Sequence, residues 1–278
     1  MNNIDKNKNF DKTVISWYPG HMVKTKRLIK EVMPLIDVIY ELIDARIPFS
    51  SKIDDINDLV RKKPRILIMT KYDLCDHVET NKWVKQYEEE GYKVVTLNLK
   101  NNQDYKKLIQ ATTNLNLNKK TNGDIKVLVM GIPNVGKSTL INVLAGKKSQ
   151  KVENKPGVTK DLVWLNTKHH IKILDTPGIL WSKLEDNAAL NLAAMTSIKD
   201  SIIPEDDVAF HILKMLHKYY PNILENRYKV TNLDDAYQVI SQNIGAIRQG
   251  EIDEKRVSMT IINDVKNEKI IGVTFDRK

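Results

Sequence analysis

The sequence predicts an α/β fold, in which a mainly parallel sheet covered by helices on both faces is followed by a smaller all-α domain. Short apolar runs of strand length alternate with amphipathic or polar stretches long enough for helices, a pattern typical of βαβ units. After residue 182 the apolar residues instead recur at helical spacing. We therefore expect one domain over residues 1–182 and a second over residues 183–278. The expected strands cover residues 36–43, 65–69, 93–98, 125–130 and 171–174.

The second domain shows its helices most clearly over residues 185–197 and 205–219. Pro204, followed by three acidic residues, suits a helix start, because the helix dipole favours negative charge there. Residues 114–123 have no apolar period and carry Asn, Lys, Thr and Gly, so we expect an exposed connection.

The composition narrows the class of protein. A hydrophobic content of 41% over 278 residues fits a folded domain or two. We find no apolar run of membrane-spanning length and no apolar core of a signal peptide near the first residues. The single cysteine, Cys75, excludes an internal disulfide and a cysteine-rich zinc site. We expect a cytoplasmic protein that does not bind membranes.

The formal charge of +9 is unevenly distributed. Residues 183–278 carry 13 Lys and Arg against 15 Asp and Glu, so the whole basic excess lies before them. A basic surface attracts phosphate backbones, but it also serves general solubility, so charge alone leaves a nucleic-acid partner open. The basic clusters are residues 24–27, residues 61–63, and Lys147, Lys148 and Lys151.

A phosphate-binding loop spans Gly131 to Ser138, with the spacing of glycine, four residues, Gly-Lys and Ser. It follows an apolar strand and precedes a helical stretch, which is the context that the motif requires. Its backbone N–H groups would surround phosphate oxygens, Lys137 would reach the terminal phosphates, and the Ser138 hydroxyl would bind Mg²⁺. The loop alone leaves ATP or GTP open. The loop residues expected at the nucleotide are Asn134, Val135, Gly136, Lys137, Ser138 and Thr139.

A metal and switch motif, Asp175-Thr176-Pro177-Gly178, follows the last expected strand. The Asp175 carboxylate is placed to hold Mg²⁺ through water, and the Gly178 N–H to sense a terminal phosphate. Thr159 lies between this motif and the loop, where a switch threonine would close on Mg²⁺.

A guanine-recognition motif, Thr70-Lys71-Tyr72-Asp73, also follows a strand. The Asp73 carboxylate can accept hydrogen bonds from guanine N1–H and the N2 amino group, a donor pair that adenine lacks. Together with the phosphate loop and the Asp175 motif, it predicts GTP as the nucleotide.

These motifs resemble those of the translation-factor-related GTPases, but in permuted order, since residues 70–73 precede the phosphate loop. The stretch from Trp17 to Lys24 and the stretch from Asp44 to Pro48 add similarity to the circularly permuted GTPases of large-subunit ribosome assembly. The resemblance covers nearly the whole chain, most densely before residue 182. It implies hydrolysis of GTP to GDP, stimulation by the ribosomal precursor, and binding of rRNA by a monomeric protein through its second domain.

Two positions depart from the family pattern. Thr70 replaces the usual Asn of the guanine motif, and we expect lower guanine affinity as a result. The Ser-Ala-like element that contacts the base carbonyl is replaced by Asn98-Leu99-Lys100, in which backbone N–H groups of Asn98 and Leu99 can still donate.

The water-orienting group must lie elsewhere than in many small GTPases, which place a Gln after the Asp175 motif. Residues 179–181 are apolar here. The resemblance assigns this role to His21, whose imidazole suits it near neutral pH; capping of a helix near Met22, or contact with RNA, stays open as its alternative. The resemblance also implies that Asn134 holds K⁺ beside the phosphates.

Other classes remain to be distinguished. A P-loop ATPase or small-molecule kinase leaves Asp73 and the Trp17 stretch unexplained. A nucleotide-gated RNA-binding module with negligible hydrolysis gains support from the missing Gln. A zinc-bearing permuted GTPase of the small subunit is excluded by the single cysteine. The reversed motif order suggests a hypothesis. The second domain follows directly after the switch motif at Asp175 to Gly178, so the nucleotide state could be coupled to the position of this domain.

Overall fold

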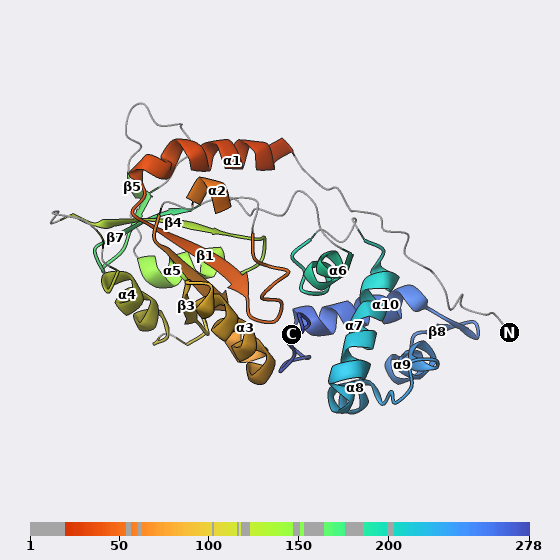
Figure 1. The fold of residues 1–278 in the computed structure, drawn as a ribbon. Helices are drawn as coiled ribbons and strands as arrows, with labels where there is room; N and C mark the ends of the chain where they lie inside the picture. The colour runs from red at the N-terminus through yellow and green to blue at the C-terminus, as the bar shows by residue number, and fades with distance from the viewer. Residues whose placement is uncertain are drawn as a thin grey trace.

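The computed structural model shows two lobes side by side, one built on a sheet and one helical (Figure 1). We call the first, up to residue 175, the sheet lobe and the second, from residue 186, the helical lobe. The predicted boundary at residue 182 lies outside the described residues. The structure describes residues 20–53, 57–60, 63–101, 103–115, 117, 123–146, 151–152, 164–175, 186–198 and 203–278.

The sheet has seven strands in the order β3-β2-β1-β4-β7-β6-β5. The five strands from β3 to β7 in this order run parallel, β6 is antiparallel to β7, and β5 is antiparallel to β6. All five predicted strands are confirmed, whereas β5 and β6 were not predicted because two and three residues are too few to show a period. The strands are β1 (Val38–Asp44), β2 (Arg65–Thr70), β3 (Lys93–Thr96), β4 (Ile125–Gly131), β5 (Lys151–Val152), β6 (Trp164–Asn166) and β7 (Ile171–Asp175).

Helices cover both faces of the sheet, which explains why its strands are continuous apolar runs; all seven residues of β1 are buried. α3 packs against Leu67 and Met69 of β2, whereas Ile66 and Ile68, which point to the opposite face, join the core that α4 and α5 cover. Figure 1 shows α1 on the side of the sheet away from α4. The helices of this lobe are α1 (Gly20–Val32), α2 (Asn57–Val60), α3 (His77–Glu89), α4 (Tyr105–Thr113) and α5 (Lys137–Ala145), with 3-10 turns η1 (Met33–Leu35) and η3 (Tyr72–Leu74).

The carboxyl ends of four parallel strands bring the predicted motifs to one edge. In the β1–β2 ladder Asp44 pairs with Thr70, and in the β1–β4 ladder Leu42 pairs with Gly131. β7 ends at Asp175 beside β4. The strand order reverses between β1 and β4, the position at which open α/β sheets bind ligands. The motif order along the chain therefore does not change the edge at which the motifs meet.

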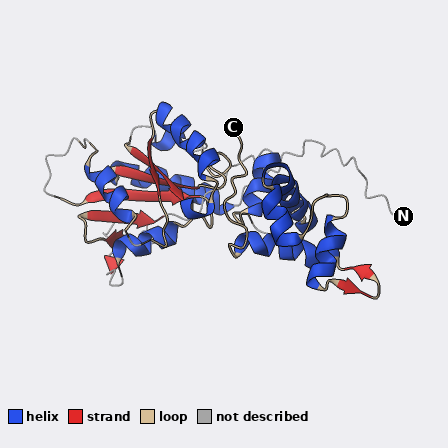
Figure 2. Cartoon of the chain, turned by 90° about the horizontal axis from the view of Figure 1, so that it is seen from below, coloured by secondary structure: helices blue, strands red, loops and turns tan. Residues whose placement is uncertain are grey.

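The helical lobe is built around α7, which packs against α6, α8 and α10. The predicted helix over residues 205–219 has the observed bounds of α7, and the one over 185–197 is shorter in the structure. A β8–β9 hairpin, which was not predicted, projects from the far end of this lobe (Figure 2). No helix in the described part of the chain has the length and apolar character needed to cross a membrane. The elements are α6 (Asp186–Ala194), α7 (Glu205–Tyr219), α8 (Pro221–Tyr228), α9 (Ala236–Ile244), β8 (Ile247–Arg248), β9 (Glu251–Ile252) and α10 (Glu254–Lys266).

Gly131, at the end of β4, is required by close packing and not only by the loop motif. A Cβ at this position would lie 2.6 Å from the Leu42 carbonyl oxygen and 3.0 Å from Val135 Cγ1. We expect Gly131→Ala to lower the free energy of unfolding by about 1–3 kcal/mol, because backbone of β1 would have to move. Denaturant unfolding followed by circular dichroism measures this. Gly123→Ala is the matched control, since nothing lies within 4 Å of its added Cβ; equal stability of both variants would contradict the packing argument.

Candidate nucleotide-binding site

The phosphate loop turns from β4 into α5 through Gly136, whose φ of 104° lies in the left-handed region that glycine favours. Gly136 has no side chain to cap α5, so the first-turn N–H groups of this helix are left for an anionic ligand. Ser138 and Thr139 lie exposed on the same turn. The predicted loop thus has the backbone geometry of an anion site.

Lys137 folds back onto its own loop. Its Nζ donates to the carbonyls of Gly131 at 3.1 Å and Ile132 at 2.8 Å. Burial lowers the pKa of Lys137 to about 8, although the charge of Asp175 acts in the opposite direction. Phosphate oxygens would offer this ammonium group stronger acceptors than neutral carbonyls do.

The Thr70 hydroxyl joins the guanine motif to the phosphate loop. Its side chain is fully buried, and Oγ1 lies 2.5 Å from the Val135 carbonyl and 3.1 Å from that of Ile43. A Cβ added at Gly136 would lie 3.1 Å from Leu99 Cδ1 and 3.8 Å from Thr70 Cβ. Three predicted motifs are therefore in contact, and the Thr70 hydroxyl is directed at the phosphate loop.

Asp44 was named in the sequence analysis only as part of a stretch that carries the family resemblance, with no role in the site. It is fully buried, and its carboxylate accepts from Arg46 Nε and Nη2 at 3.0 and 2.8 Å and from Lys71 Nζ at 2.8 Å. Burial by itself would raise the pKa of Asp44, but the charges of Arg46 and Lys71 hold this pKa well below its usual range. Lys71 has a φ of 56°, unusual for a residue with a side chain, and its ion pair with Asp44 fixes it there. The sequence signal that could have identified Asp44 is an acidic residue at the end of an apolar strand.

The two base-recognition elements are held in different ways. Asp73 is exposed and lies in η3, a single 3-10 turn that begins directly after Lys71. The loop after β3 is fixed by its own side chains: the Asn98 N–H donates to Asp104 Oδ2 at 3.0 Å, and Asn98 Oδ1 accepts from the Lys100 N–H at 2.9 Å. Leu99, between them, packs on the phosphate loop. The roles of Asp73, Asn98 and Leu99 toward guanine stay predictions.

Asn134 connects the phosphate loop to the helical lobe, a contact that sequence reasoning did not predict. Its φ is 57°, and its Nδ2 donates to the Thr196 carbonyl at 2.6 Å. Thr196 follows α6 and also has a positive φ, of 58°. The amide oxygen of Asn134 is on the opposite side of this bond and is not used by it.

The remaining predicted residues can be placed only in part. His21 lies in the first turn of α1, and its side chain is outside the described residues. Thr159 and Gly178 are also outside them. Asp175 is exposed at the end of β7. Within the described ranges no three His, Cys, Asp or Glu side chains cluster as a metal site.

The Thr70 bridge predicts a specific loss. Thr70→Val keeps the shape of the side chain but removes its hydroxyl group. The hydrogen bond from this hydroxyl to the buried Val135 carbonyl is then lost, and the phosphate loop is held less firmly. We expect the Kd for GDP to rise about five- to thirty-fold, equivalent to about 1–2 kcal/mol. Titration with a fluorescent GDP measures it. Thr260→Val removes a comparable hydroxyl bond, to the Arg256 carbonyl in α10, and should leave the Kd unchanged; equal affinities of the two variants would remove Thr70 from the site.

The pKa of Lys137 predicts proton uptake on binding. In the free protein this pKa is about 8, and phosphate charges raise it in the complex. At pH 9 most free Lys137 is neutral whereas bound Lys137 is charged, so binding takes up close to one proton and the affinity for GDP falls as pH rises above 8. Titration calorimetry in two buffers of different ionisation enthalpy counts the protons. At pH 7 the count should be near zero, and the same count at both pH values would refute the prediction.

Comparisons with known proteins agree with this geometry. Residues 126–248 match the family model described as "50S ribosome-binding GTPase", and residues 60–185 match the one described as "RsgA GTPase". Ribosome biogenesis GTPase A of Bacillus licheniformis is 40% identical over 95% of this chain and 98% of its own length.

Two solved structures are also similar over nearly the whole chain. A GDP-bound structure of YlqF has a TM-score of 0.67 and 25% identity, and covers 90% of this chain and 98% of its own. The GNP-bound structure of YlqF from T. maritima has a TM-score of 0.67 and 26% identity, and covers 91% and 98%. These structures bear out the permuted P-loop fold. The chain is therefore a GTP-hydrolysing member of the ribosome biogenesis GTPase A family.

Proposed function

We propose that this GTPase acts in assembly of the large ribosomal subunit, that the ribosomal precursor stimulates its hydrolysis of GTP, and that the helical lobe docks on rRNA. The observation that carries the proposal is the direct contact between the phosphate loop and the helical lobe through Asn134 and Thr196. A lobe in contact with the loop that holds the phosphates is placed to respond to the nucleotide. The match to a "50S ribosome-binding GTPase" model extends across this contact and supports the same partner.

The distribution of charge supports rRNA as part of that partner. The basic excess lies before residue 183, and in the described residues α1 presents Arg27 and Lys30 to solvent. Contacts of this kind give binding that weakens steeply with salt. The helical lobe is close to neutral, so shape and local contacts would set its docking.

His21 is our candidate for orienting the attacking water. α1 begins at Gly20, so His21 occupies the first turn of a helix near the start of the described chain. The apolar residues 179–181 offer no group for this task. Helix capping or contact with RNA is the alternative role, and the activity of a His21 variant separates them.

Bound cations complete the proposed site. Mg²⁺ would be held by Ser138, Thr159 and Asp175. When bound, this ion neutralises negative charge on the phosphates. Asn134 would hold K⁺ through its amide oxygen, because its Nδ2 is already committed to Thr196.

The proposal predicts nucleotide-dependent binding to one subunit. We expect the protein to co-sediment with purified large subunits, or their precursors, more strongly with a non-hydrolysable GTP analogue than with GDP. Phosphate release should rise by about 10³-fold or more with these particles, the range a partner that completes such a site supplies. Small subunits are the control.

Three outcomes would overturn parts of the proposal. Equal co-sedimentation with both subunits would refute the large-subunit assignment. Binding without stimulated phosphate release would favour the non-hydrolysing RNA-binding module. In the same assay, unchanged stimulated turnover in His21→Ala would remove His21 from the mechanism, and equal rates in NaCl and KCl would remove the K⁺ site.

A further inference from the structure

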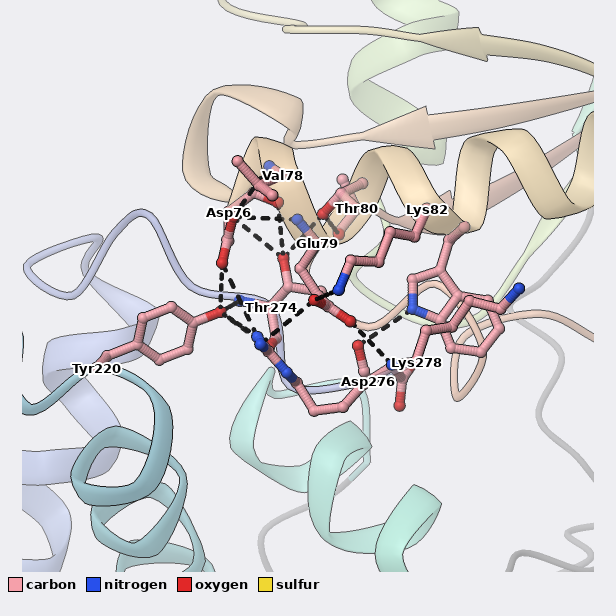
Figure 3. A network of polar contacts seen from close by, with 12 residues as sticks. Asp76, Val78, Glu79, Thr80, Lys82, Tyr220, Thr274, Asp276 and Lys278 are labelled. Carbon is pink, nitrogen blue, oxygen red and sulfur yellow. Dashed lines mark hydrogen bonds and ion pairs between the residues drawn. The ribbon is translucent and has the colours of Figure 1, made fainter.

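The segment after α10, residues 267–278, leaves the helical lobe and packs onto the sheet lobe. Four of its side chains, Ile270, Val273, Thr274 and Phe275, are at most 2% exposed. It lies between α3 and the helical lobe, where a network of polar contacts surrounds it (Figure 3). The two lobes are therefore joined at a place far along the chain from the switch motif.

This segment is hydrogen-bonded to the residues that directly follow the guanine motif. The N–H of Gly272 donates to the Leu74 carbonyl at 2.8 Å. Thr274 Oγ1 accepts from the Asp76 N–H at 3.1 Å. Leu74 is the last residue of η3, the turn that carries Asp73, so two backbone groups just beyond Asp73 are fixed by the 267–278 segment.

Tyr220, between α7 and α8, ties the helical lobe to the same point. Its hydroxyl accepts from the Thr274 N–H at 2.9 Å and lies 3.0 Å from Asp76 Oδ2. Burial raises the pKa of Tyr220 to about 12, so the hydroxyl stays protonated and can donate to Asp76. Asp76 in turn caps α3 by accepting from the N–H groups of Val78 and Glu79. Figure 3 shows Tyr220 pointing at this junction.

The segment also holds the other side of the guanine motif. The Phe275 N–H donates to the Arg46 carbonyl at 2.8 Å. Asp276 is buried and accepts from the Ser50 hydroxyl at 2.6 Å and from Asn191 Nδ2 of α6 at 2.8 Å. Since the Arg46 side chain fixes Asp44, and Asp44 fixes Lys71, the segment supports both ends of the turn that contains Asp73.

We propose that the 267–278 segment positions the guanine-reading turn, residues 71–76, so that guanine selectivity depends on docking of the helical lobe. Asp73 is exposed on one 3-10 turn, and its carboxylate must meet two base donors within a few tenths of an ångström, which a short turn maintains only with outside support. By linkage, a guanine base that binds the fixed turn strengthens lobe docking by the same factor. The inference rests on the proposed role of Asp73 in reading guanine.

Tyr220→Phe tests the proposal in the full-length chain. The variant removes one hydroxyl, which is hydrogen-bonded to Asp76 and to the Thr274 N–H. We expect the Kd for GDP to rise about three- to ten-fold, in line with loss of one or two hydrogen bonds. The Kd for IDP, whose base lacks the 2-amino donor, should rise less, so the preference for GDP over IDP shrinks. Both constants come from competition against a fluorescent GDP.

The matched control is Tyr237→Phe, which removes a tyrosine hydroxyl bonded to Ser258 Oγ at 2.8 Å within the helical lobe. It should leave both constants unchanged. Thr274→Val is a second test of the segment, and circular dichroism confirms that each variant is folded. A purely structural role would lower stability with the GDP-to-IDP ratio intact, and this result in both Tyr220→Phe and Thr274→Val would overturn the proposal.

Asp73→Asn separates this inference from the role assigned to Asp73. Loss of guanine preference in Asp73→Asn, with unchanged preference in Tyr220→Phe and Thr274→Val, would refute the positioning role alone. Intact guanine preference in Asp73→Asn would refute the guanine-reading role and the inference with it.

Discussion

A single buried hydrogen bond, from the Thr70 hydroxyl to the Val135 carbonyl, joins two motifs that lie 65 residues apart in the chain. It crosses the point where the sheet order reverses, so the predicted base-recognition motif directly contacts the phosphate loop. Both Thr70 and Val135 are fully buried, so loss of this donor would weaken the hydrogen bonding of a carbonyl that is shielded from solvent. The rest of the site is arranged around this connection.

Much of the sheet lobe could be predicted because its physics is local. Strands buried on both faces are continuous apolar runs, and five of them were visible as such. β5 and β6 were not, since two- and three-residue strands derive their pairing from β7 and not from their own composition. The helical lobe was predicted best at α7, whose acidic first turn and apolar period agree. The β8–β9 hairpin, with both strands exposed, has no burial pattern to reveal it.

The site was predictable where chemistry depends on residue type and spacing, as at Gly131 to Thr139. It was not predictable where a residue acts through tertiary partners. Asp44 becomes important only because β1 lies between β2 and β4, which brings its carboxylate to Lys71. Thr196 is unremarkable in sequence, yet its carbonyl receives the Asn134 amide. Such partners lie more than 25 residues from the motifs that they support, and no local pattern encodes them.

The reversed motif order suggested that the helical lobe is attached to the sheet lobe through the switch motif at Asp175 to Gly178. The structure shows more than this one attachment. Permutation makes the chain leave the sheet lobe after β7, which lies beside β4, and the helical lobe comes next in the sequence. The structure adds two further attachments, at Asn134 and through the 267–278 segment. The first touches the phosphate loop and the second touches the turn that carries Asp73. Because the helical lobe contacts both regions, a ligand that favours one arrangement of either region also biases the contacts that hold this lobe.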